Sequence, residues 1–150
     1  MRLTSFTDYT LRVLLYLGAR GEEAQLATIG DIAGAYGISE NHLKKVVHHL
    51  AKKGYIRTTR GKGGGMELAR APEQINLGKV VRGAEEDRSL VDCLPEGGPP
   101  CVILPACTLP RILANALGAF FAELDKYTLA DLVRPPGPLV KIFTAPSSRR

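Results

Sequence analysis

The sequence is poor in the residues that mark many enzymes and all disulfide-built domains. It has no tryptophan, only three cysteines, and only three histidines, His42, His48 and His49. The histidines lie together and far along the chain from the cysteines, so no Cys–His nucleophile pair is expected. An odd number of cysteines also argues against a disulfide framework. These absences predict that the protein is not an enzyme.

Long hydrophobic runs are also missing. The chain starts Met1-Arg-Leu-Thr4 without an apolar signal core, and no segment approaches the roughly 20 apolar residues of a membrane span. We therefore expect a cytoplasmic protein with no membrane partner, in a compartment that keeps thiols reduced. A chain of 150 residues, 45% of them hydrophobic, fits one compact domain with an appended element.

Acidic residues are absent from one segment. Between Asn41 and Met66 there is no aspartate or glutamate, but there are seven cations: Lys44, Lys45, Lys52, Lys53, Arg57, Arg60 and Lys62. This segment carries +7 in a chain of net charge +5, so the remaining residues sum to −2. Such asymmetry favours a polyanionic partner over a merely solvated face.

The start of the chain has the signals of an amphipathic helix. Ser5 as the cap and Asp8 three residues later predict the first turn, and apolar residues recur at helical spacing as far as Gly18. Arg12 follows Asp8 by one turn, so the two side chains can pair on one face. From these residues alone, Asp8 is an acid favoured by the helix dipole and by a neighbouring arginine.

Two further helices form a helix-turn-helix, expected over about residues 28–51. Thr28-Ile-Gly-Asp31 is a capping box that opens a short helix over 29–36, and Ser39 caps a third helix over about 40–53. The connecting turn, Tyr36-Gly-Ile-Ser39, contains the glycine typical of this motif. In the third helix Leu43, Val46, Val47 and Leu50 form the apolar side, and the polar side is left for a partner.

A basic hairpin, expected over about residues 55–70, completes a winged helix. Strands are predicted over 55–59 and 66–69, joined by the turn Arg60-Gly-Lys-Gly-Gly-Gly65. A phosphate-binding glycine loop is the alternative, but the spacing matches no P-loop and no helix follows. The predicted partner is therefore double-stranded operator DNA, with the third helix in the major groove and the wing along the backbone.

The expected DNA contacts divide into two groups. Base contacts are expected from the front of the third helix, and phosphate contacts mainly from its flank and the wing. The predicted DNA-binding residues are Thr28, Ser39, Asn41, His42, Lys44, Lys45, His48, Arg57, Arg60, Lys62 and Gly63.

The second half of the chain, residues 77–133, predicts a sensor and association region after the DNA-binding region at 1–76. A short strand leading into a helix is expected over 75–86, and a long helix over 109–126 carries an apolar stripe wider than a small winged helix needs. We expect this helix to build a homodimer; an intrachain core helix is the alternative. A helical turn over 128–133 follows, Pro135-Pro-Gly-Pro138 is expected to end the fold, and residues 134–150 are expected to form a flexible tail.

All three cysteines lie between these helices, as Cys93, Cys101 and Cys107 with C-x7-C-x5-C spacing. Four prolines and two glycines in this stretch exclude a regular helix or strand and predict a wrapped loop. Three soft thiolate ligands in one loop favour a soft metal or an iron–sulfur cluster. A disulfide with one free thiol, or three unrelated cysteines, are the alternatives.

The winged helix, the cysteine loop and the following helix together resemble the family of iron–sulfur winged-helix repressors. The matching motifs cover residues 1 to about 133: Met1-Arg-Leu-Thr-Ser-Phe-Thr-Asp-Tyr-Thr-Leu-Arg12, Arg60-Gly-Lys-Gly-Gly-Gly65, the cysteines, and Leu124-Asp-Lys-Tyr-Thr-Leu-Ala-Asp-Leu-Val133. The nitric-oxide-sensing branch is the closer match. Its start resembles Phe6-Thr-Asp8, whereas the branch that senses iron–sulfur status has a histidine where this chain has Pro110.

The resemblance implies a cofactor and a mechanism. It implies one iron–sulfur cluster per subunit, [2Fe-2S] or [4Fe-4S], held by the three cysteines and by Asp8 of the partner subunit. It implies a repressor that releases operators of nitrosative-stress genes when nitric oxide attacks the cluster, with Asp8 and Arg12 as the switch. The gap between Cys93 and Cys101 is longer than the family pattern, but insertions in a loop are tolerated.

Three rival classes share some of these features. An iron–sulfur-status or redox sensor would have the same fold, and a zinc-stabilised DNA-binding protein would use the same cysteines with Asp8 or water. An electron-transfer protein or cluster scaffold would explain the cysteines but leave the basic wing without a role.

Overall fold

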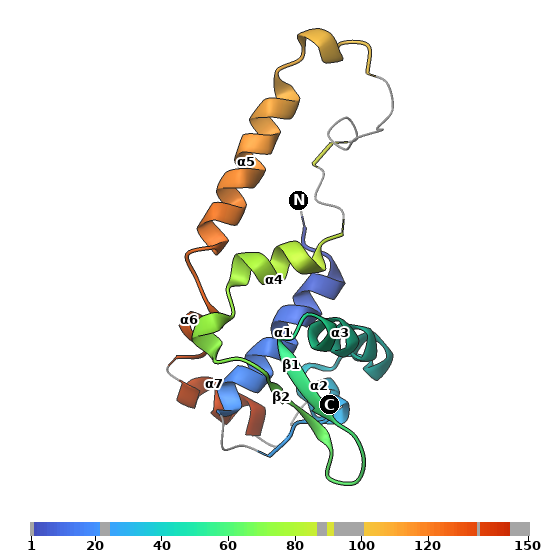
Figure 1. The fold of residues 1–150 in the computed structure, drawn as a ribbon, viewed down its shortest axis with the longest axis vertical. Coiled ribbons are helices and arrows are strands. Elements are labelled where there is room, and N and C mark those ends of the chain that lie inside the picture. The colour runs from blue at the N-terminus through green and yellow to red at the C-terminus, as the bar shows by residue number, and fades with distance from the viewer. Residues whose placement is uncertain (1, 22–24, 87–89, 92–100, 135, 145–150) are drawn as a thin grey trace.

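The computed structural model describes residues 2–21, 25–86, 90–91, 101–134 and 136–144, and its first half is the predicted winged helix (Figure 1). Its elements are α1 (Ser5–Arg20), α2 (Ile29–Tyr36), α3 (Glu40–Lys52), β1 (Ile56–Thr59) and β2 (Gly65–Leu68). The fold class, mainly helical with a two-stranded antiparallel hairpin, is confirmed.

Helix α1 is the centre of the structure, because α3 packs against it and so do three later helices, α4 (Leu77–Ala84), α6 (Leu129–Val133) and α7 (Pro136–Thr144). We call the winged helix together with these three helices the body. Val13 and Leu14 are fully buried on α1, and Ile32 and Leu43 meet them from the helix-turn-helix. The start of α1 differs from the prediction by one residue. Thr4, and not Ser5, is the N-cap, since its side-chain oxygen accepts a hydrogen bond from the amide of Thr7. The capping box of Thr28 and Asp31 is present as predicted.

The wing is a short hairpin whose turn requires glycine. Ile56 pairs with Leu68 and Thr59 with Gly65, and Ala27 adds an isolated bridge to Met66. Gly63 has a φ of 78°, a left-handed conformation that side chains disfavour. A Cβ at Gly64 would overlap the carbonyl oxygen of Thr59. The glycine run is therefore a geometric requirement of the turn, as its hairpin assignment implied.

The second half of the chain adds a projecting arm. Its elements are η1 (Pro72–Gln74), α4 (Leu77–Ala84), η2 (Leu104–Ala106), α5 (Leu109–Leu124), α6 (Leu129–Val133) and α7 (Pro136–Thr144). We call residues 101–124, which hold η2 and α5, the arm. It rises from the body beside α4 and carries η2 at its far end, opposite the wing (Figure 1).

The long helix ends near the predicted residue but is not an intrachain core helix. Within the described chain, Phe121 is the only buried residue of α5. Leu109 and Ile112 expose 48% and 56% of their surfaces. An apolar stripe left open in this way is what a helix that packs against another molecule would show.

Two expectations for the second half were wrong. The segment before α4 is not a regular strand; it forms only an isolated bridge, between Asn76 and Thr128, and η1 precedes it. The fold also does not end at Pro135–Pro138, since α7 starts there and its Phe143 packs against Tyr16 and Tyr36 at 5.0 and 5.4 Å between ring centroids. Proline is tolerated in the first turn of a helix, where its missing N–H has no intrahelical acceptor. Residues 145–150 of the predicted tail lie outside the described residues.

In the described part of the chain, no helix is both long and apolar enough to cross a membrane.

Candidate nucleic-acid interface and sensor site

Helix α3 presents one polar face, as its pattern predicted. Leu43, Val46, Val47 and Leu50 are buried against the body. The side chains expected to contact DNA are exposed: Ser39, Asn41, His42, Lys44, Lys45 and His48. Ser39 is the N-cap of α3, but its side chain makes no capping hydrogen bond. Its hydroxyl is therefore not committed to its own helix.

The wing lies beside α3 and adds further cations. Arg57, Arg60 and Lys62 of the hairpin are exposed, as are the lysines at the end of α3, Lys52 and Lys53, and those nearer its start, Lys44 and Lys45. Arg57 pairs with Glu67 across the hairpin at 3.2 Å, with both side chains largely in solvent. A surface pair of this kind is weak, so Arg57 can exchange Glu67 for a phosphate. Thr28 is exposed too, but its side chain closes the capping box of α2.

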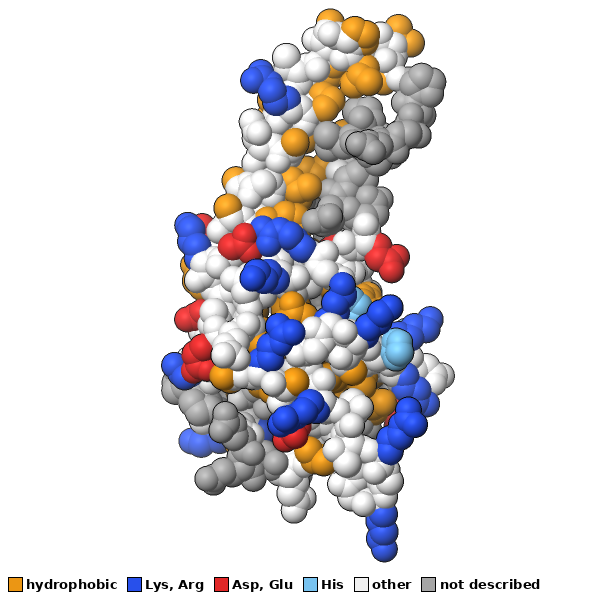
Figure 2. Space-filling model, viewed as in Figure 1, with side chains coloured by type: hydrophobic (Ala, Val, Ile, Leu, Met, Phe, Trp, Pro, Cys, Tyr) orange, Lys and Arg blue, Asp and Glu red, His pale blue; other side chains and the backbone are white. Residues whose placement is uncertain are grey.

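The surface differs between the body and the arm. Figure 2 shows most lysine and arginine side chains on the body and wing, with acidic side chains among them, whereas hydrophobic side chains are prominent along the arm, which carries a cation near its far end. The two ends of the molecule are therefore suited to different partners, a polyanion for the body and an apolar surface for the arm.

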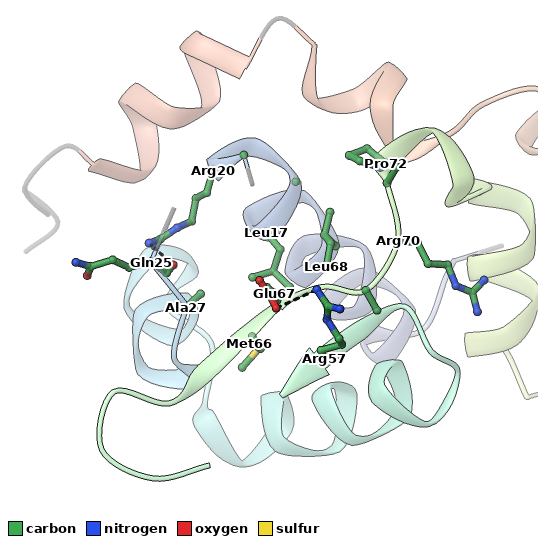
Figure 3. A pocket seen from close by; sticks show the side chains of 14 residues that line it. Leu17, Arg20, Gln25, Ala27, Arg57, Met66, Glu67, Leu68, Arg70 and Pro72 are labelled. Atoms are coloured by element: carbon green, nitrogen blue, oxygen red, sulfur yellow. Dashed lines mark hydrogen bonds and ion pairs between the residues drawn. The ribbon is translucent and has the colours of Figure 1, made fainter. Parts of the chain in front are cut away.

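A cavity of about 370 Å³ lies between the end of α1 and the wing (Figure 3). Three arginines line it, and each already has a partner. Arg20 donates to the Tyr16 hydroxyl and to the Gln25 carbonyl, Arg57 pairs with Glu67, and Arg70 donates to the Lys53 carbonyl. The cavity therefore offers no cluster of unpaired cations for an anionic ligand.

The described cysteines lie at the far end of the arm. Cys101 and Cys107 are free, half-buried thiols on either side of η2. The amide of Leu104 donates to the Cys101 carbonyl at 3.0 Å, and the amide of Cys107 donates to the Leu104 carbonyl at 3.2 Å. Two soft donors held by one short turn fit an iron–sulfur cluster or a zinc ion. Cys93 lies outside the described residues.

Asp8 lies in the first turn of α1, on the body rather than on the arm. Arg12 Nε donates to its Oδ2 at 2.9 Å, as the i, i+4 spacing predicted, and the carboxylate remains about half exposed. The Arg12 guanidinium also lies 5.4 Å from the centre of the Tyr36 ring. Burial raises the pKa of Tyr36 to about 12, so this ring stays neutral.

Within the described residues, no group of three histidine, cysteine, aspartate or glutamate side chains could hold a metal. The structure therefore brings Cys101 near Cys107 but does not bring Asp8 of the same chain to them.

Two aromatic contacts of the recognition helix were not foreseen. Tyr9 of α1 is half-buried and stacks on His42, with ring centroids 6.1 Å apart. Phe6 meets the edge of His49 at 5.3 Å. Burial lowers the pKa of His49, and nearby Lys53 adds to the effect. Both contacts join the first turns of α1 to α3, and helical spacing alone gave no signal for them.

An exposed basic recognition helix beside a basic wing defines a winged-helix DNA-binding protein, not an enzyme. The family model described as Rrf2, iron-dependent transcriptional regulator, matches residues 3–135. The chain belongs to the Rrf2 family.

Similar proteins agree with this assignment. The chain is 47% identical over 143 residues to the HTH-type transcriptional regulator NsrR of Bacillus subtilis (strain 168), covering 95% of this chain and 97% of that protein. It is 53% identical over 133 residues to the regulator of the same name from Geobacillus kaustophilus (strain HTA426), covering 89% and 90%. The expected resemblance is thus confirmed as a resemblance to regulators named NsrR.

Solved structures share the fold. The oxidised form of Staphylococcus aureus CymR has a TM-score of 0.69 at 25% identity, covering 89% of this chain and 97% of that one. A Listeria innocua protein described as a putative transcriptional regulator has a TM-score of 0.71 at 26% identity, covering 89% and 87%. The protein is therefore a DNA-binding transcriptional regulator.

Proposed function

We propose that the protein is a homodimeric repressor that releases its operators in response to nitric oxide. The sensing group is an iron–sulfur cluster held by Cys93, Cys101 and Cys107 of one subunit and Asp8 of the partner subunit. The observation that carries the proposal is the separation within one chain: free thiols at the tip of the arm, and an exposed carboxylate on the body. A second copy could supply the missing ligand.

The arm supports the dimer. Its apolar stripe is open in the single chain, with Leu109 and Ile112 about half exposed and Val102 at its tip 97% exposed. Burying apolar surface is the main force for subunit association. Two arms packed together would cover these side chains and carry each cysteine loop towards the other body.

Asp8 has two possible partners in this scheme. In the single chain it accepts a hydrogen bond from Arg12, whose guanidinium also lies over Tyr36 at the end of α2. If Asp8 bound the cluster held by the partner's cysteine loop, it would lose its hydrogen bond from Arg12, and α1 would be attached to the partner subunit. Because Tyr36 immediately precedes the turn of the helix-turn-helix, this exchange would alter the setting of α2 and α3.

The DNA contacts follow from the exposed face. Ser39, Asn41, His42, Lys45 and His48 are proposed to read bases, while Lys44, Arg57, Arg60 and Lys62 hold phosphates, with Thr28 and Gly63 at the edges. Two recognition helices must match half-sites about one helical turn apart. Loss of the attachment of α1 to the partner subunit would change the spacing of the two recognition helices, and the operator would be released.

When bound, an iron–sulfur cluster would supply iron sites that react with nitric oxide. Cys93, Cys101 and Cys107 would hold the cluster together with Asp8 of the partner subunit, and the contact from Asp8 through Arg12 to Tyr36 would pass the loss of that ligand to the helix-turn-helix.

The test compares wild type with Asp8→Asn and Glu123→Gln. Glu123 is an exposed acid on α5 that pairs with Lys126, so its substitution removes one carboxylate without touching the proposed ligand set. Operator affinity would be measured by fluorescence anisotropy, without oxygen, before and after nitric oxide is added. Wild type and Glu123→Gln should lose affinity on adding nitric oxide, whereas Asp8→Asn should bind weakly throughout.

Two results would refute parts of the proposal. If Asp8→Asn responded like wild type, the carboxylate would not be a ligand. If wild-type protein contained zinc and ignored nitric oxide, the cysteines would stabilise a DNA-binding protein without sensing.

A further inference from the structure

The arm is attached to the body mainly through α4. Arg82, in the last turn of α4, donates from Nη1 and Nη2 to the two carboxylate oxygens of Asp125 at 2.7 and 2.5 Å. Its guanidinium also lies 4.7 Å from the centre of the Phe121 ring. We call Arg82, Phe121 and Asp125 the arm latch. The hydrogen bond from Arg82 lowers the pKa of Asp125, so the pair is charged at neutral pH.

A glycine makes room for the latch. A Cβ at Gly78 would overlap the Asp125 carboxylate, so any larger residue there must displace it. Gly83 lies on the same helix, and a Cβ there would meet nothing within 4 Å. The chain thus offers one glycine that the latch requires and one, a few residues away, that it does not.

The C-terminal end of α4, just beyond Arg82, reaches the start of α1. Glu85, the C-cap of α4, is only 9% exposed. Its Oε1 accepts hydrogen bonds from the Thr4 amide at 2.8 Å and from the Thr4 hydroxyl at 3.1 Å. Thr4 caps α1, and its carbonyl accepts the amide proton of Asp8 at 3.0 Å. Glu85 therefore holds the turn of α1 that carries Asp8.

Helix α4, which carries both contacts, is itself held in place. Val80, Val81 and Ala84 are buried, and α4 packs against α1 as well as α5. Asn76, the N-cap of α4, also donates to the Asp125 carbonyl at 2.7 Å. A short helix held at both ends and along one face moves as a unit.

We propose that α4 couples the cysteine-bearing arm to Asp8. Asn76 at the N-cap and Arg82 hold Asp125 at the base of the arm, and Glu85 at the C-cap holds Thr4; Arg82 and Glu85 are the positioning residues. A change in the tilt of the arm would move α4 and, through Glu85 and Thr4, the first turn of α1. This inference rests on the proposed function for its purpose, since it links the two halves of the ligand set within one chain. The mechanical coupling itself needs no cluster.

The test is hydrogen–deuterium exchange of the full-length, metal-free protein. Three variants would be compared with wild type: Gly78→Ala breaks the arm latch, Glu85→Gln weakens the hold on Thr4, and Gly83→Ala is the matched control. Peptides over residues 2–10 and 119–128 report on the two ends. Thermal unfolding of each variant checks that the body remains folded.

The expected result is reciprocal. Because coupling between two sites acts in both directions, Gly78→Ala should speed exchange about fivefold at residues 119–128 and also at 2–10, and Glu85→Gln should affect both peptides as well. Gly83→Ala should change neither. If each variant affected only its own end, α4 would not couple them and the proposal would be overturned.

A second variant and a second readout keep the result interpretable. If Gly78→Ala unfolded, Asp125→Asn would replace it, since it weakens the latch without a steric change. The operator affinity of wild type with and without nitric oxide is measured in parallel. A wild type that ignores nitric oxide refutes the proposed function, whereas the exchange pattern alone decides the coupling.

Discussion

The wing makes a quantitative prediction about salt. Arg60 and Lys62 are exposed, and neither forms an ion pair with another described residue. If each side chain neutralises one phosphate, the double variant Arg60→Ala/Lys62→Ala should release two fewer counterions from DNA on binding. The slope of log affinity against log salt should then become shallower by about 1.8, at about 0.9 for each phosphate contact.

This slope has a direct experimental consequence. Between about 50 and 200 mM salt, wild-type affinity for operator should fall roughly twelvefold more than that of the double variant, because a fourfold rise in salt is taken to the power 1.8. Fluorescence anisotropy with labelled operator at four salt concentrations measures this. Random-sequence DNA of the same length should give the same difference, since phosphate contacts carry no sequence information.

Arg111→Ala is the matched control for the loss of charge. Arg111 is an exposed cation on α5, in the arm and away from the wing. It should leave the slope unchanged. Arg60 and Lys62 would not contact phosphates if the double variant kept the wild-type slope. The same conclusion would follow if Arg111→Ala changed the slope as much as the loss of a wing cation does.

Three further predictions concern the body. Gly18→Ala should lower the free energy of unfolding by about 1 kcal/mol because its Cβ would press on Val133 and Leu129. Gly34→Ala should raise the free energy of unfolding by about 0.5–1 kcal/mol, because its Cβ meets nothing within 4 Å. If urea unfolding ranked the two variants the other way, the packing around Gly18 would be wrong. Burial lowers the pKa of His49, so as the pH falls the unfolded chain is protonated at this residue before the folded chain is. The free energy of unfolding should therefore fall as the pH drops below the ordinary pKa of 6.5. His49→Gln should flatten this part of the stability–pH profile, and an unchanged profile would show that His49 does not cause it. Phe143→Ala should lower the free energy of unfolding by about 2 kcal/mol, because it removes the ring that packs on Tyr16 and Tyr36. Ile142→Ala should lower it much less, because the Ile142 side chain is 63% exposed. Equal losses of stability would mean that α7 does not dock through Phe143.

Local signals predicted most of the winged helix. The capping box at Thr28, the apolar side of α3 and the glycine turn of the wing each depend on residues within a few positions of one another, and all are present in the structure. The pairing of Asp8 with Arg12 followed from one helical turn of spacing. The exposed face of α3 followed from the same periodicity.

Contacts between distant residues could not be predicted in this way. Arg82 meets Asp125 across 43 positions, and Glu85 meets Thr4 across 81. Neither pair has a spacing rule, because tertiary packing alone brings the residues together. The docking of Phe143 could not be predicted for a related reason: the prolines before it favour an end of the fold, although the first turn of a helix also accepts proline.

The central claim is that the cysteine loop and Asp8 of two subunits hold an iron–sulfur cluster that responds to nitric oxide. Native mass spectrometry of protein isolated without oxygen, before and after nitric oxide is added, tests it most directly. The expected result is a dimer whose excess mass equals iron plus sulfide in each subunit, with further mass shifts that match bound nitric oxide. A dimer that carries zinc and is unchanged by nitric oxide would contradict the claim.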